Sequence, residues 1–295
     1  MTDGNNQWLA ERFQEQRPHL RAVAYRMLGS LSEADDALQE AWLRASSADT
    51  SGVENLGGWF TTVVARVSLN MLRARKAKRE QPLEMGIPDP VVSPRDGADP
   101  EHEALIADSA GLALLVVLDT LAPAERLAYV LHDMFAVPFD EIASITGRTP
   151  VAARQLASRA RRRIQGNAAV PDADLGRQWE VVEAFAAASR DGDFAALLEV
   201  LDPDIVLRED DGTERPAASA VIRGARAVAE RASSFSHLAI YARQVLVNGA
   251  PGALVLTDDG PFALLAFTVR GGRVVEINVL NDPERLRALD LSAIG

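Results

Sequence analysis

Cysteine is absent from the 295-residue sequence, and its absence excludes disulfides, thiolate nucleophiles and cysteine-based zinc sites. Histidine occurs only four times, and the four positions are too scattered to form a local metal-ligand motif. We therefore expect neither a metal nor any other cofactor.

Long apolar runs are missing too. The longest one extends from Leu112 to Leu118 and ends at Asp119, far short of the roughly 18 residues that a membrane-spanning helix needs. The first residues contain neither the basic segment nor the apolar stretch of a secretory signal. We expect a cytoplasmic protein that does not associate with membranes.

The net charge of −11 by itself argues against DNA binding, but the charge is unevenly distributed. Residues 1–170 carry 19 basic and 22 acidic side chains, whereas residues 171–295 carry 12 and 20. Local clusters of positive charge determine phosphate affinity, whatever the total. Two such clusters lie in the first part of the chain: Arg73, Arg75, Lys76, Lys78 and Arg79, then Arg154, Arg159, Arg161, Arg162 and Arg163.

Helical spacing dominates the first 80 residues. One helix ends at Gly29, and a second begins near Ser32, which forms an apparent capping box with Asp35. A third is predicted from Trp59 to Arg79. Its predicted inward residues are Trp59, Val63, Val67 and Met71, and its outer face carries Thr62, Arg66, Asn70 and Arg73.

A proline-rich segment separates these helices from a second helical region. Five prolines and no periodicity between Gln81 and Pro100 are typical of a linker. Further on, a helix around Ile142 is followed by Gly147 at a turn, Thr149 as a cap and Pro150 at the first position of another helix. This order predicts a helix-turn-helix.

From Pro171 the sequence changes in character. Helical segments are followed by short strand-like runs, the last two joined through Gly271-Gly272. A curved antiparallel sheet backed by helices is the expected fold. The whole chain is thus predicted to contain a helical bundle (1–80), a flexible linker (81–108), a helix-turn-helix domain (109–168) and an α+β domain (175–295).

Three segments together resemble the extracytoplasmic-function (ECF) class of bacterial RNA polymerase sigma factors. They are Asp35-Asp36-Ala-Leu-Gln39-Glu40-Ala-Trp42-Leu-Arg44, then the helix from Trp59 to Arg75, and then Leu121-Ala-Pro-Ala-Glu125-Arg126 with the helix-turn-helix. The resemblance covers about residues 8–165. It implies an alternative sigma factor that binds RNA polymerase core and directs promoter-specific transcription initiation.

The resemblance also implies roles for particular residues. The coiled coil of the largest subunit of polymerase core would meet Asp35, Asp36, Gln39, Glu40 and Trp42, and the flap of the core is a further expected partner. The promoter element near minus ten would be read by Asn55, Thr62, Arg66, Asn70, Arg73 and Arg75, which can contact unpaired bases and phosphates. The minus-thirty-five element would be read by Thr149, Val151, Arg154, Gln155, Ser158, Arg159, Arg161 and Arg162.

The tail is similar to SnoaL-like domains, which have a cone-shaped α+β fold, and sigma factors with such a tail form a recognised subset. Three segments correspond to its regulatory motifs: Pro88-Asp89-Pro90, Asp210-Asp211-Gly212, and Asn281-Asp282-Pro283-Glu284-Arg285-Leu286. The first lacks the preceding aromatic residue, and Asp282 and the single Gly212 are departures from the pattern. The resemblance implies regulation from within the chain, with no requirement for a separate anti-sigma protein.

Two other functions stay open at this point. A helix-turn-helix regulator would bind duplex DNA without polymerase, and co-purification with polymerase core would distinguish it from a sigma factor. A DNA-binding fusion to a SnoaL-like enzyme would need an acid or base inside the cone, for which the candidates are His237, Tyr241, Glu276 and Asn278. We expect no catalysis, because this spacing matches no known motif. A cavity for a small ligand is the stronger alternative, and a purely protein-binding surface is the leading interpretation of the tail.

Overall fold

The computed structural model describes residues 2–78, 86–96, 111–167, 171–212 and 219–294. These residues divide into two compact units. The first contains residues 2–78 and 117–167, and the second contains 86–96, 111–116 and the described residues from 171 onward. Among the helices described, none is long and apolar enough to cross a membrane.

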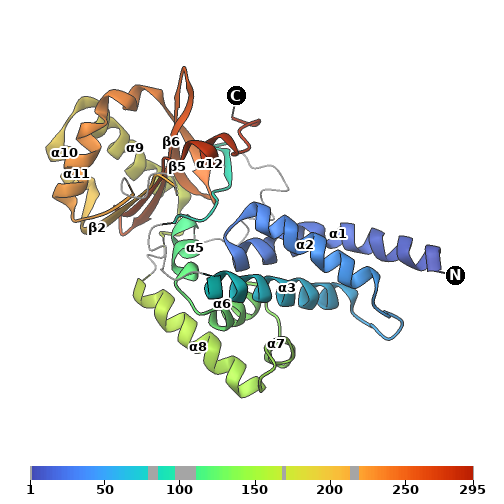
Figure 1. The fold of residues 1–295 in the computed structure, drawn as a ribbon. Helices are drawn as coiled ribbons and strands as arrows, with labels where there is room; N and C mark the ends of the chain where they lie inside the picture. Colours follow the sequence, from blue (N-terminus) through green and yellow to red (C-terminus); the bar gives the residue numbers. More distant parts are fainter. Residues whose placement is uncertain (1, 79–85, 97–110, 168–170, 213–218, 295) are drawn as a thin grey trace. The chain divides into compact units, whose positions relative to one another are not determined.

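Three helices form one part of the first unit (Figure 1): α1 (Thr2–Leu28), α2 (Leu31–Ser46) and α3 (Leu56–Lys78). The helix α2 begins two residues earlier than predicted. Its cap is Ser30, whose hydroxyl accepts a hydrogen bond from the Glu33 amide at 3.4 Å, so the predicted cap at Ser32 is wrong. The glycine between α1 and α2 has a φ of 75°, which favours this residue.

The buried side of α3 is rotated from the predicted one. Phe60 and Val64 are fully buried, whereas Trp59 and Val63 are half-buried. The ring of Phe60 meets that of Phe13 edge-on, with 5.1 Å between centroids, and this contact sets the orientation of the helix. Trp59 packs against Phe60 but is only half-buried, so it is not part of the fully buried core that was expected.

The remaining elements of the helical region are α5 (Gly111–Asp119), α6 (Pro123–Tyr129), a π-helical turn (Val130–Met134), α7 (Phe139–Thr146) and α8 (Pro150–Asn167). Gly147 ends α7 in the left-handed conformation, with a φ of 67°. Thr149 accepts a hydrogen bond from the Ala152 amide at 3.2 Å and so caps α8 as predicted.

Part of the predicted linker belongs to the second unit instead of being flexible. Residues 86–96 are described, and β1 (Val92–Pro94) pairs antiparallel with β4, so that Val92 lies opposite Val247. The prolines in this segment led to its prediction as a linker. An edge strand tolerates a proline, because its outer side needs no amide donor. Residues 81–85 and 97–108 of the predicted linker lie outside the described residues.

The second unit is built on a seven-stranded sheet in the order β1-β4-β5-β6-β7-β2-β3. The strands β2 and β7 are parallel to each other, and all other neighbouring strands are antiparallel. The sheet is therefore mixed and not purely antiparallel. Its strands are β2 (Leu201–Asp210), β3 (Ala220–Arg223), β4 (Ala242–Val247), β5 (Ala250–Thr257), β6 (Gly260–Arg270) and β7 (Arg273–Leu280).

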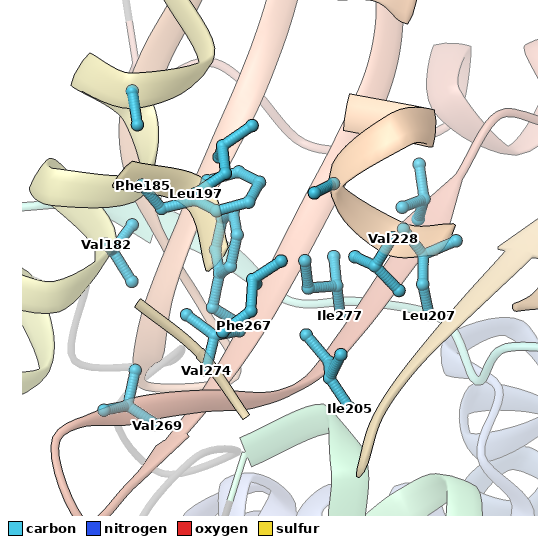
Figure 2. Close-up of a cluster of buried hydrophobic side chains, with 14 of the residues drawn as sticks. Val182, Phe185, Leu197, Ile205, Leu207, Val228, Phe267, Val269, Val274 and Ile277 are labelled. Carbon is cyan, nitrogen blue, oxygen red and sulfur yellow. The ribbon is translucent and has the colours of Figure 1, made fainter. Parts of the chain in front are cut away.

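Helices cover one face of this sheet (Figure 1). They are α9 (Leu175–Asp191), α10 (Phe194–Val200), α11 (Ala225–Ser234) and a 3₁₀ turn (Ser236–Tyr241), and a short α12 (Pro283–Arg287) follows β7. In the core, Phe185 of α9 packs against Phe267 of β6 with 5.3 Å between ring centroids. Leu197, Val228 and Ile277 complete this apolar layer, which Figure 2 shows in detail. The prediction of helical domains followed by an α+β domain is confirmed.

Candidate functional site

A groove of about 340 Å³ lies between α1 and α2. Its lining includes Phe13 and Arg17 from α1, and Asp36, Gln39 and Trp42 from α2. The indole of Trp42 is half-buried and tilts against Phe13, with 5.3 Å between ring centroids. Three of the predicted polymerase-binding residues thus meet in a concave surface that presents an aromatic ring beside polar groups.

The other two predicted residues of α2 have partners within the chain. Asp35 also lines the groove, but both of its carboxylate oxygens accept hydrogen bonds from Arg21 at 3.0 Å. Glu40 pairs with Arg44 one turn along the same helix at 2.8 Å. The pair of Asp35 and Arg21 joins α1 to α2, so it fixes the shape of the groove.

Sequence reasoning missed the contribution of α1. Gln14 and Arg17 line the groove, and their spacing of three residues places them on one face of a helix. This polar face of the first helix could have indicated that α1 contributes to the groove. It was not recognised because no sequence motif includes these residues.

The outer face of α3 holds the predicted minus-ten residues in different environments. Asn55 precedes the helix and caps it by accepting a hydrogen bond from the Gly58 amide at 3.0 Å. Asn70 and Arg73 are exposed, and Thr62 is half-buried. The structure therefore gives Asn55 a structural contact and leaves Asn70 and Arg73 open to solvent.

Two arginines of α3 contact other elements of the first unit. Arg66 is exposed but reaches the carbonyl of Ser144 at 3.4 Å. Arg75 is half-buried, donates to the Leu28 carbonyl at 3.1 Å and forms an ion pair with Glu33. Arg75 thereby ties the end of α3 to the junction of α1 and α2. Of the basic run that follows, Arg79 lies outside the described residues.

The amino-terminal part of α8 exposes several of its predicted DNA-contacting side chains. Val151 is 60% exposed, an unusual environment for a large apolar side chain. Arg154, Gln155 and Ser158 are exposed on the same helix, while Leu156 is buried against the rest of the domain. The guanidinium of Arg154 lies over the ring of Phe139, 5.5 Å from its centroid.

Two arginines of α8 that were predicted to contact the minus-thirty-five element are engaged in ion pairs. Arg159 donates to Glu125 at 3.0 Å, and Arg161 donates to Asp133 at 2.6 Å. These bonds fasten α8 to α6 and to the π-helical turn, which gives both arginines a structural role. Arg162, which directly follows Arg161, is exposed.

The three predicted regulatory segments of the second unit meet around Arg285. Its guanidinium donates to Asp210 at 2.7 Å, to the Ile87 carbonyl at 2.6 Å and to Asp89 at 3.0 Å. Asp210 in turn accepts a hydrogen bond from the Ile87 amide at 2.8 Å, and its own side chain is almost fully buried. We call this group the linker clamp and define it as Ile87, Asp89, Asp210 and Arg285.

The departures from the motif have structural explanations. Asp282 caps α12 by accepting hydrogen bonds from the amides of Glu284 and Arg285 at 2.9 and 3.3 Å. Gly212 has a φ of 82°, and a Cβ there would lie 2.7 Å from the Asp282 carboxyl carbon. Only glycine fits beside this cap.

Asn248 supports the same part of the chain and was not predicted. Its side-chain oxygen accepts a hydrogen bond from the Val91 amide at 3.2 Å, and its own amide donates to the Val91 carbonyl at 2.8 Å. Asn248 has a φ of 51° and is followed by Gly249 in the turn between β4 and β5. An Asn-Gly pair between strands is a strong hairpin signal, which would have located this turn.

The cone contains a cavity of about 630 Å³. The lining includes Ile277 and Val279 of β7, so Glu276 and Asn278, which alternate with them, point to the other face of the sheet. Glu276 lies 2.8 Å from Arg208 and accepts from Asn278 at 2.9 Å. His237 and Tyr241 are exposed and are not part of the lining. The four candidates for catalysis are therefore not gathered inside the cone.

Comparisons with known proteins agree on the nature of the chain. Residues 13–78 match the family described as Sigma-70 region 2, and residues 111–164 match Sigma-70, region 4. The ECF RNA polymerase sigma factor SigJ of Mycobacterium tuberculosis is 37% identical over 286 residues, covering 92% of this chain and 91% of that protein. The probable ECF sigma factor SigI of the same species is 31% identical, covering 92% and 93%.

A solved structure extends the similarity to the fold. The crystal structure of M. tuberculosis SigJ superposes with a TM-score of 0.77 at 32% identity, covering 96% of this chain and 99% of that one. The similarity therefore includes the helical unit and the α+β unit.

Proposed function

The chain belongs to the ECF RNA polymerase sigma factors, and on this basis we propose which surfaces serve transcription initiation and how the second unit controls them. As an alternative sigma factor, the protein directs transcription in partnership with RNA polymerase and promoter DNA. We assign it to the cytoplasm, with no cofactor and no requirement for an anti-sigma protein.

Polymerase core docks on the groove between α1 and α2. The supporting observation is that Asp36, Gln39 and Trp42 line one concave surface with Arg17. A half-buried aromatic ring surrounded by polar side chains is typical of an interface anchor. Asp35 and Glu40 contribute by shaping this surface, because their carboxylates are paired within the chain. The polymerase coiled coil is the partner of this groove, and the flap is the partner of the helix-turn-helix domain.

The outer face of α3 holds the unpaired strand near minus ten. Asn70, Arg73 and Arg66 are exposed along it, and the partly exposed ring of Trp59 provides a stacking surface at its start. Stacking and phosphate contacts are the interactions that favour single strands over duplex. Asn55, Thr62 and Arg75 belong to the same proposed interface, with Asn55 and Arg75 acting through the helix that they hold in place.

The helix α8 enters the major groove at minus thirty-five. Its first turn, with Thr149 and Val151, and the following residues Arg154, Gln155 and Ser158 would face base edges. An exposed valine at this point suits contact with a thymine methyl group. Arg162 contacts phosphate, while Arg159 and Arg161 position the helix through Glu125 and Asp133.

The second unit controls the sigma regions by holding the linker between them. The observation that carries this proposal is Arg285, which binds Ile87 and Asp89 of the linker together with Asp210 of the sheet. Because residues 86–96 are held by the second unit, fewer residues remain free to connect sigma regions 2 and 4. A clamped linker restricts the arrangements that the two regions can adopt, and release of the clamp enlarges that set.

A transcription assay tests this control. We expect Arg285→Ala, assayed with purified polymerase core on a cognate promoter, to raise run-off transcription roughly three- to tenfold, since about 1 kcal/mol or more of restraint is removed. The matched control is Arg287→Ala on the same helix, because Arg287 is exposed. Equal rates for the parent and both variants, at equal amounts of soluble protein, would refute control by the clamp. A lower rate for Arg285→Ala alone would mean that the clamp supports the active arrangement.

We further propose that the cone is not an enzyme. The arrangement of Glu276 and Asn278, which pair with Arg208 and with each other on the face away from the cavity, supports this assignment. The cone holds a small ligand instead. A turnover that depends on Glu276 or His237 would contradict the assignment.

A further inference from the structure

The cavity of the cone has the dimensions of a ligand site. Its volume of about 630 Å³ falls within the roughly 300–1,000 Å³ that is usual for pockets that bury a small molecule. Its walls come from α9, β4 to β7 and the 3₁₀ turn, and its deeper part reaches the apolar layer of Phe185 and Phe267 (Figure 2). The cavity lies entirely within the second unit.

Large apolar side chains surround its mouth. Phe235, Ile240 and Phe262 line the cavity and are 38%, 70% and 46% exposed. Few large apolar residues of the described chain are as open to solvent, and these three gather at one opening. An exposed apolar cluster around a cavity marks a binding surface.

The charges in the lining balance. Arg190, Arg231 and Arg243 are matched in number by Glu209, Asp211 and Asp259. Glu209 is buried, and both of its oxygens accept hydrogen bonds from Arg231 at 2.8 Å, which raises the pKa of that guanidinium. Arg231 also lies 4.5 Å from the ring centroid of Phe235. An ionised ligand therefore gains no net attraction and would lose its hydration, whereas an uncharged one loses little.

Several lining residues are directly connected to the linker. Gln244 of the cavity wall accepts a hydrogen bond from Arg95, which also pairs with Glu183 at 2.7 Å. Glu209 and Asp211 flank Asp210 of the linker clamp. Leu286, next to Arg285 on α12, is buried and also lines the cavity. The walls of the cavity and the contacts of residues 86–96 are thus made by the same short segments.

We infer that the cone binds an uncharged, mainly apolar molecule of drug size, and that its occupancy strengthens the hold on residues 86–96. A molecule in the cavity stabilises the assembled arrangement of β2, β4 and α12, and this is the arrangement that presents Asp210, Gln244 and Arg285 to the linker. The inference extends the proposed control by supplying its chemical signal.

A pair of fluorescent probes tests the site on the full-length chain. N-phenyl-1-naphthylamine is uncharged, and 1-anilinonaphthalene-8-sulfonate is the same ring system with a sulfonate. We expect saturable binding of the uncharged probe with one site per chain, at an affinity at least about tenfold above that of the sulfonate. Absence of saturable binding, or a preference for the sulfonate, overturns the inference.

Two adjacent alanines of α9 provide a matched test of location. Ala186 lines the cavity, whereas Ala187 is exposed outside it. Ala186→Trp should fill the cavity and weaken binding of the uncharged probe by tenfold or more, and Ala187→Trp should leave it unchanged. Where Ala186→Trp fails to fold by circular dichroism, Phe262→Ser at the exposed mouth replaces it and should also weaken binding. Equal affinities of all variants for the uncharged probe would overturn the location of the site. A dimer of the parent protein that dissociates in the Phe262→Ser variant would overturn it as well.

Hydrogen exchange tests the connection to the linker. With saturating uncharged probe, the amides of Ile87 and Val91, which donate to Asp210 and Asn248, should exchange more slowly. Unchanged exchange with the probe bound overturns the coupling. These measurements need no polymerase, so they stand apart from the transcription test: an Arg285→Ala factor with unaltered transcription removes the proposed control and leaves the probe result intact.

Discussion

Arg154 on α8 and Arg285 on α12 have opposite environments. Arg285 is half-buried, and it donates hydrogen bonds to two carboxylates and a carbonyl of its own unit. Arg154 is exposed and touches only the face of an aromatic ring among the contacts described for it. An arginine whose donors are satisfied internally holds the fold together, whereas one whose donors face solvent can bind phosphate or a base.

The same distinction applies within each basic cluster. Arg159 and Arg161 are paired and Arg154 and Arg162 are exposed, although all four lie on one helix. Sequence alone gives these residues a common role as a positive patch. The environment of each guanidinium separates support from recognition.

The largest expected effect concerns Arg126, a buried arginine in the helical unit. It is 2% exposed, and burial lowers its pKa, while Asp119 and the Arg26 carbonyl accept its hydrogen bonds. Asp119→Ala leaves this charge without its carboxylate and should reduce the free energy of unfolding by about 3 kcal/mol. Urea unfolding followed by circular dichroism measures the loss.

The control for this experiment is Glu54→Ala in an exposed loop, which should change stability by less than about 0.5 kcal/mol. A double variant with Arg126→Met should recover part of the loss, because the buried charge is then removed. Equal stabilities for Asp119→Ala and Glu54→Ala would break the distinction between enclosed and exposed charges.

The next effect concerns recognition by α8. Arg154→Ala should weaken binding to the minus-thirty-five element by about 1 to 3 kcal/mol and relax the preference at one base pair. Arg162→Ala should weaken binding on all sequences alike and reduce the salt dependence. Equilibrium binding to a panel of single-base variants distinguishes the two, and a uniform loss for Arg154→Ala would make it a phosphate contact.

A smaller effect is expected at the groove between α1 and α2. Replacement of Asp36 and Gln39 by alanine should weaken binding to polymerase core about tenfold without a change in helicity. Asp35→Ala should instead lower stability, because it removes the bond to Arg21 that joins the helices. If the double variant binds core as well as the parent does, the groove is not the docking surface.

The smallest effect concerns Asp172, a partly exposed carboxylate that accepts hydrogen bonds from the backbone. Asp172 accepts hydrogen bonds from the amides of Gly271 and Gly272 at 3.0 and 3.2 Å, and these bonds lower its pKa. Its stabilising contribution is therefore present above its ordinary pKa of 3.8 and is lost as the pH falls through the lower folded-state value. The Tm of the parent should fall more than that of Asp172→Asn as the pH decreases from 5 to about 3. Parallel pH profiles would show that these bonds contribute nothing.

Local signals made the helix-turn-helix predictable. Gly147, Thr149 and Pro150 specify the end of one helix and the start of the next within a few residues, and the structure has them in those positions. The buried side of α3 was harder to predict from the sequence. Apolar residues occur on more than one side of it, and the contact of Phe60 with Phe13 on a distant helix selects the buried side.

The strand β1 and the linker clamp could not be derived from local pattern. Val92 and its partner Val247 are far apart in the sequence, and the prolines around Val92 favour a linker. The family resemblance named the three clamp segments, but their convergence on Arg285 depends on the tertiary fold. The predicted site residues of the helical unit remain predictions of function.

The position of β1 in the sequence has a consequence for synthesis of the protein. Val92 leaves the ribosome 155 residues before Val247, the strand residue with which it pairs. Both sigma regions are complete at Asn167, 80 residues before Val247. At roughly 5–20 residues per second, the nascent chain therefore spends about 4 to 16 seconds with both regions made and the linker still unheld. Each new molecule therefore passes through a period without this restraint, which is acquired only after Val247 has been synthesised.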